Sequence, residues 1–236
     1  MPRKAAELLE SITGKLAPDP HANRLLPLIG RGAARRSTLA ALCLEQRHVI
    51  EADRRAFLHL AQRSAWGSAR PGEAGSGGAS AVSEFFTVLA EGEAVAGHRL
   101  GAFGAACGVD EEQAAAYQPL ADCQSYPAYV AWLALNGEPA DVVLALNTNF
   151  AAWGDYCATI ADALRRHYGY DDAACAFFDL FAEPGPELRQ KSLAAVEEGL
   201  DSGRTDEHEA LRYGRLLQAY EARFWHALWE LDQRTG

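Results

Sequence analysis

Apolar residues recur every three or four positions along most of the chain, and this spacing constrains the fold more than any other feature of the sequence. In the longest such stretch, from Asp141 to Tyr168, Val142, Leu146 and Phe150 follow one another at four-residue intervals, which places them on one face of a helix. No stretch shows a sustained alternation of β-branched residues, the pattern typical of strands. The sequence therefore predicts an all-α protein, a compact multi-helix bundle.

Turn-forming residues divide the rest of the chain into further helices. These helices are expected at residues 3–16, 37–63, 80–107, 111–117, 125–133, 172–181, 188–200 and 211–231. We expect 27–36 to form a loop, and Pro127 to lie in the first turn of its helix, where the missing N–H costs little. The glycine-rich stretch at about 67–79 predicts a flexible connector, because it lacks the glycine-lysine pattern of a phosphate-binding loop. We expect residues 1–236 to form a single domain.

Charge and cysteine content exclude several classes of protein. The formal net charge of -10 at pH 7 opposes binding to nucleic acid or to anionic membranes. No apolar run approaches the roughly 20 residues of a membrane span, and acidic residues interrupt the N-terminal stretch that a secretion signal would need. The 5 cysteines form no closely spaced pair and are expected to be reduced thiols. We therefore expect a cytoplasmic protein whose partner is a small molecule.

The final predicted helix carries an acidic residue among aromatic ones. Glu221 lies beside the apolar stripe that contains Tyr220 and Phe224, and Trp225 follows it one turn later. Desolvation raises the pKa of a carboxyl group in such a setting into the range where it exchanges protons near neutral pH. The alternative is that Glu221 faces water at the rim of the helix, as most helical glutamates do.

Three short segments carry a resemblance to a known family. They are Tyr126-Pro-Ala-Tyr129, then Asn136-Gly137 before a long helix, and finally the segment from Tyr220 to Trp225. In this order they resemble the TenA (thiaminase II) family of the heme-oxygenase-like superfamily, over roughly residues 35–231. The resemblance implies a heme-oxygenase-like fold with a buried pocket for an aminopyrimidine. It also implies a homo-oligomer and a hydrolase of the thiamin-salvage type that needs no cofactor.

Particular residues match functional positions of that family. Asp53 matches the aspartate that binds the amino group and ring nitrogen of the pyrimidine, and Tyr126 matches a pocket tyrosine. Glu221 matches the glutamate that acts as acid and base, and Phe224 matches the aromatic residue near the ring. Asn149 stands where members that cleave thiamin have a nucleophilic cysteine. Because an amide cannot attack carbon in this way, the resemblance implies C–N hydrolysis without a covalent cysteine intermediate, with Asn149 as a pocket residue.

Two other functions stay open. Without the cysteine, the chain could be a non-catalytic protein that keeps the pocket and binds a pyrimidine or another small molecule. Alternatively, Glu91 and His98 lie seven residues apart, on one helical face, and would serve as ligands in a dimetal oxidase of the same superfamily. Such an enzyme also needs a later cluster of aspartate and histidine, and residues 188–200 contain no histidine. We therefore expect no metal site.

Overall fold

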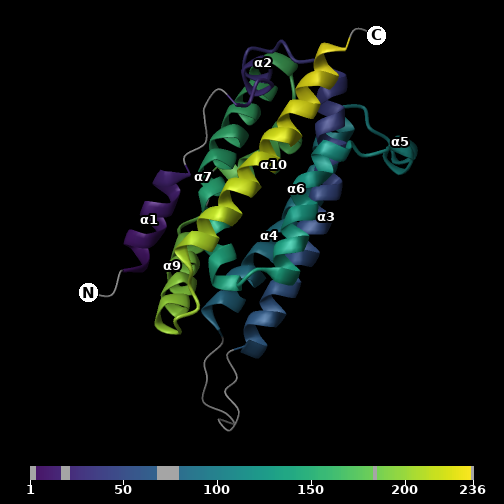
Figure 1. Ribbon diagram of the computed structural model, residues 1–236. Coiled ribbons are helices and arrows are strands. Elements are labelled where there is room, and N and C mark those ends of the chain that lie inside the picture. The colour runs from purple at the N-terminus through teal and green to yellow at the C-terminus, as the bar shows by residue number, and fades with distance from the viewer. Residues whose placement is uncertain (1–3, 17–21, 68–79, 183–184, 235–236) are drawn as a thin grey trace.

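The computed structural model describes residues 4–16, 22–67, 80–182 and 185–234, which fold into an all-helical bundle (Figure 1). In chain order the elements are α1 (Ala5–Lys15), α2 (Leu26–Gly30), α3 (Arg36–Gly67), α4 (Ala81–Ala106), α5 (Glu111–Ala116), α6 (Ala121–Asn136), α7 (Pro139–Ala163), the π-helical segment η1 (Leu164–Tyr168), α8 (Asp172–Ala182), α9 (Pro186–Asp201) and α10 (Glu207–Gln233). No strand occurs within these described ranges, so the all-α prediction is confirmed. None of the described helices combines the length and apolarity needed to cross a bilayer.

The long helices α3, α4, α6, α7 and α10 run side by side along the bundle (Figure 1). Helices α1 and α9 lie toward one end, and α2 lies toward the other. Helix α5 contains no buried residue and projects from the bundle, held by a capping box between Asp110 and Gln113. The long helices are therefore the elements that can surround an internal site.

The interior is divided into two hydrophobic clusters. One contains Leu60, Phe85 and Leu217 and is covered by α1 and α9, and the other contains Phe103 and Leu228 and is covered by α2 and α8. Each cluster buries fully desolvated aliphatic and aromatic side chains, which supply most of the free energy of folding. Polar groups placed between the two clusters would not disrupt the packing of either one.

Two local expectations are wrong. Residues 27–36 are not all loop, because the short helix α2 begins within an Asn23 turn whose Oδ1 accepts from the N–H groups of Leu25 and Leu26. Pro127 lies in the interior of α6 rather than in its first turn, because α6 begins earlier than expected. The stretch 67–79, apart from the end of α3 at residue 67, lies outside the described residues.

A buried glutamate on α3 explains the early start of α6. Glu45 is fully buried, and its carboxylate accepts hydrogen bonds from Tyr117 Oη, Leu120 N and Gln124 Nε2, each at 2.7 Å. The bond from Leu120 satisfies the backbone N–H at the N-cap of α6, where a helix cannot satisfy its own N–H groups. A side chain 75 positions earlier in the chain thus determines where α6 begins.

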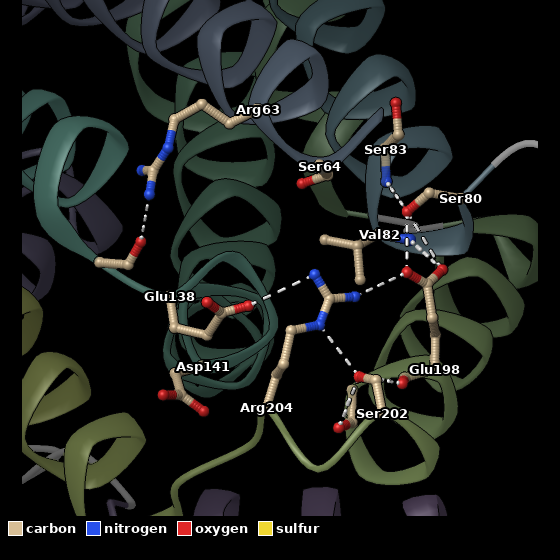
Figure 2. Close-up of polar contacts among 12 residues, drawn as sticks. Arg63, Ser64, Ser80, Val82, Ser83, Glu138, Asp141, Glu198, Ser202 and Arg204 are labelled. Carbon is tan, nitrogen blue, oxygen red and sulfur yellow. Dashed lines mark hydrogen bonds and ion pairs between the residues drawn. The ribbon is translucent and has the colours of Figure 1, made fainter. Parts of the chain in front are cut away.

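A polar network joins the α9–α10 connection to α4 and α7 (Figure 2). Arg204 donates to Glu198 Oε1 at 3.1 Å and to Ser202 Oγ at 3.0 Å, and its Nη1 lies 3.9 Å from Glu138 Oε1. Glu198 also accepts from Ser80 Oγ at 2.9 Å. Because α10 begins shortly after this connection, the network fixes the position at which the final helix enters the bundle.

Arg204→Ala should lower the free energy of unfolding by about 1–2 kcal/mol, because it removes the guanidinium partner of the partly buried Glu138 and Glu198. Chemical denaturation followed by circular dichroism at pH 7 measures the change. The control is Arg55→Ala, since Arg55 pairs with Glu51 where the two side chains are 74% and 66% exposed. Its unfolding midpoint should not move. Equal losses in the two variants would show that the network contributes no more than a surface ion pair.

Candidate functional site

A cavity of about 260 Å³ lies between the two hydrophobic clusters. The inner faces of α3, α4, α6, α7, α8 and α10 contribute most of its walls. On α3, for example, Val49, Ile50, Asp53 and Phe57 line the cavity at spacings of one, three and four residues, which is one stripe of a helix. The site is thus built from the inward faces of helices whose outer faces meet water or other helices.

The cavity brings together the side chains that the family resemblance singled out. Asp53 comes from α3, Tyr126 from α6, Asn149 from α7, and Glu221 and Phe224 from α10, and all of them line this cavity. Tyr126 also packs against both hydrophobic clusters. Residues far apart in the sequence therefore form one pocket, because their helices lie side by side.

Two buried polar atoms in this cavity have no hydrogen-bond partner among the described residues. Asp53 is 4% exposed and its Oδ1 is unpaired, while Asn149 is 5% exposed and its Nδ2 is unpaired. A buried polar group without a partner costs about 1–3 kcal/mol. The cavity therefore presents one unsatisfied acceptor and one unsatisfied donor to whatever occupies it.

A second carboxyl group shares the cavity with Asp53. Burial raises the pKa of Asp53 to about 8. Glu93 on α4 also lines the cavity, and burial together with the neighbouring Asp53 raises its pKa well above the usual range. The sequence alone did not identify Glu93 as a site residue. Its spacing of four residues from Leu89, another lining residue, was the available signal that it faces inward.

Glu221 lines the cavity and is half-buried. Its Oε1 accepts from Trp225 Nε1, one turn later on α10, at 3.4 Å. Burial raises the pKa of Glu221 to about 7, although the bond from Trp225 opposes the shift. Near neutral pH this carboxyl group is therefore present in both protonation states, which is what an acid and base catalyst requires.

Tyr126 remains a hydrogen-bond donor at all ordinary pH values. Burial raises the pKa of its phenol well above the usual value, and the negative charges of Asp53, Glu221 and Glu93 raise it further. The phenol therefore lies close enough to feel the charges of all these carboxyl groups. It is therefore a neutral donor that lines the site.

Aromatic side chains form much of the remaining wall. Trp153 on α7 and Trp225 on α10 both line the cavity, with ring centroids 6.2 Å apart. Phe181 on α8 meets Trp153 edge to face at 5.6 Å. Trp225 is buried in the core and also borders the cavity. Such walls suit a flat ring.

No lysine, arginine, histidine or cysteine of the described residues lines the cavity. Cys157 is fully buried outside it, and burial and Glu221 raise the pKa of its thiol well above the usual value. Glu91 and His98 lie exposed on α4 and do not line the cavity. Within the described part of the chain, no group of three or more histidine, cysteine, aspartate or glutamate side chains is placed to hold a metal ion.

Comparison with known proteins agrees with this architecture. The model of the TENA/THI-4/PQQC family matches residues 82–230. A domain of unknown function with a heme oxygenase-like fold, from Shewanella denitrificans, is 17% identical with a TM-score of 0.67, covering 97% of this chain and 90% of that one. A TenA homolog from Pseudomonas syringae is 11% identical with a TM-score of 0.74, covering 96% and 93%. No curated protein matches the sequence. The expected heme-oxygenase-like fold is confirmed.

Asp53→Asn should raise the free energy of unfolding at pH 8 by about 1–3 kcal/mol. The folded-state pKa of Asp53, about 8, lies above the unfolded value of about 3.9. Its contribution to stability is therefore complete below about pH 4 and is lost as the pH rises through 8. Asparagine does not ionise, so the advantage of the variant should shrink toward pH 4. Urea denaturation between pH 4 and 8 tests this, and an advantage that grows on acidification would contradict it.

Proposed function

The chain belongs to the TENA/THI-4/PQQC family, and from this we propose that it is a hydrolase that acts on an aminopyrimidine, of the thiamin-salvage type. It cleaves a C–N bond without a covalent cysteine intermediate. The observation that carries the proposal is the meeting of Asp53, Tyr126, Asn149, Glu221 and Phe224 in one cavity with aromatic walls. A flat heterocycle with donor and acceptor edges is the ligand that such a lining suits.

Asp53, Tyr126 and Phe224 hold the ring in this proposal. The unpaired Oδ1 of Asp53 accepts from the exocyclic amino group, and in its protonated form the same carboxyl group donates to the ring nitrogen beside it. The phenol of Tyr126 supplies a further donor. Phe224 and the tryptophans contact the faces of the ring, so the reacting methylene carbon is directed toward Glu221.

Glu221 supplies the proton transfers of the reaction. Protonated Glu221 gives its proton to the leaving amine of aminomethyl-pyrimidine as the C–N bond breaks. The resulting carboxylate takes a proton from water, whose oxygen forms the new bond to the methylene carbon. The products are hydroxymethyl-pyrimidine and ammonia, and Glu221 returns to its protonated state. A pKa of about 7 suits both steps at neutral pH.

Glu221→Gln should lower the rate of ammonia release from aminomethyl-pyrimidine at least about 100-fold, because glutamine transfers no proton. A coupled ammonia assay at pH 7 measures the rate, and circular dichroism checks the fold. The control is Glu230→Gln on the same helix, since Glu230 is 52% exposed and pairs with His226 away from the cavity. Its rate should equal that of the unaltered enzyme. Efficient cleavage of thiamin would contradict the proposal, since it would require a nucleophile that the cavity lacks.

The second candidate is a binding protein that keeps the pocket without turnover. Asn149 favours it, because an amide stands where thiamin-cleaving members of the family have cysteine, and its unpaired Nδ2 suits binding rather than attack. Thermal stabilisation by aminopyrimidines, with no ammonia released from any of them, would select this function over the hydrolase.

We also propose a homo-oligomer in the cytoplasm. Trp132 and Leu135 on α6 are large apolar side chains that are 42% and 66% exposed, and a second copy of the chain would cover them. Sedimentation velocity should show a species larger than 25.5 kDa. Leu135→Glu should shift this species toward the monomer. A monomeric unaltered protein at micromolar concentration would rule the oligomer out.

A further inference from the structure

Two of the acidic side chains of the cavity come from adjacent helices and act on each other. Asp53 lies on α3 and Glu93 on α4, and the charge of Asp53 raises the pKa of Glu93. Helices α3 and α4 pack along each other over much of their length. Glu93 is half-buried and lines the cavity. One wall of the site is therefore a pair of carboxyl groups that disfavour each other's ionisation.

The described lining of the cavity contains no positively charged side chain that could neutralise the two carboxyl groups. The titratable groups that line it are Asp53, Glu93, Tyr126 and Glu221, and every one of them is acidic. From α7 and α8 the described lining residues are apolar apart from Asn149. Either protons or a cationic ligand must therefore neutralise the carboxyl pair.

Two further observations indicate an organic ligand. Asp53 Oδ1 and Asn149 Nδ2 are both buried and unpaired, although each residue lines the cavity. A hard metal ion takes at least about six oxygen ligands in a wet or charged cage, whereas this wall offers two carboxyl groups beside Phe57 and Val88. A flat cation with delocalised charge fits better, because its N–H groups match carboxylate oxygens and its faces meet aromatic rings.

We propose that Asp53 and Glu93 form a carboxylate clamp for a flat protonated amidine group, the N–C–N edge of a ring or substituent, and that Glu93 sets the preference for the cationic form. The inference rests on the proposed function only in taking the same cavity as the ligand site. Asp53 binds one nitrogen of the amidine edge, whether the ligand is charged or neutral. Glu93 adds the second negative charge, and thereby distinguishes an amidinium from a neutral amide of the same shape.

Benzamidine and benzamide provide the test, because they share a flat ring and differ in the charge of the substituent. Isothermal titration at pH 8 should show that the unaltered protein binds benzamidine at least about tenfold more tightly than benzamide. Glu93→Gln should remove most of that preference and change benzamide binding by less than about threefold. Glu91→Gln, an exposed position on the same helix, is the matched control and should retain the preference.

The proton balance gives a second measurement. Because the clamp binds protons when empty, benzamidine should displace about one proton on binding, and benzamide should displace none. Titrations in buffers with different enthalpies of ionisation measure this number. Equal affinity for the two ligands in the unaltered protein, or a preference that survives in Glu93→Gln, would overturn the proposal. An unfolding midpoint at or above that of the unaltered protein shows that the variant is folded.

The clamp and the proposed hydrolase can be tested separately. Glu221→Gln should abolish turnover while it retains the preference for benzamidine, because Glu221 is not part of the clamp. If aminomethyl-pyrimidine is not hydrolysed but Glu93→Gln loses the preference for benzamidine over benzamide, the clamp is supported and the hydrolase is ruled out. If hydrolysis occurs and Glu93→Gln binds benzamidine and benzamide as the unaltered protein does, the clamp is ruled out and the hydrolase is supported.

Discussion

The meeting of Asp53, Glu93 and Glu221 around one cavity, with no basic side chain in its described lining, is the constraint on which the rest of the structure depends. Taking an ionised carboxyl group out of water is costly unless a cation or several donors compensate it. Here the compensation is incomplete, and the pKa of each group rises instead. The protein therefore keeps protons inside an apolar bundle, where they are available for binding and for chemistry.

The two hydrophobic clusters make such a site tolerable. Each cluster is packed closely enough to exclude water without the help of the other. The cavity between them therefore lowers the stability of the protein but does not disrupt the packing of either cluster. Tyr126 spans the boundary, since its ring contacts both clusters. Rigid helices on every side then hold the polar groups in place, which favours preorganised binding over adaptation.

Family membership and local chemistry agree in part. The TENA/THI-4/PQQC family accounts for the helical architecture, and the matched positions meet in the cavity. Asn149 and Glu93 both line this cavity: one presents an unpaired amide donor, and the other adds a second carboxyl group to the wall that contains Asp53. An amide is not a nucleophile, and a carboxyl group suits a polar, positively charged edge, so both side chains are consistent with the proposed non-covalent function.

The sequence by itself determined the helical class and most helix positions, because the spacing of apolar residues is a local property that each segment expresses alone. It also singled out Asp53 and Glu221 through resemblance. Only the tertiary structure decided that Glu93 faces inward while Glu91 faces water, and that α6 begins where Glu45 satisfies its first turn. The physical reason is that a helix can present any of its faces to the interior. The choice depends on contacts with helices that are distant in the chain, and local spacing alone does not specify those contacts.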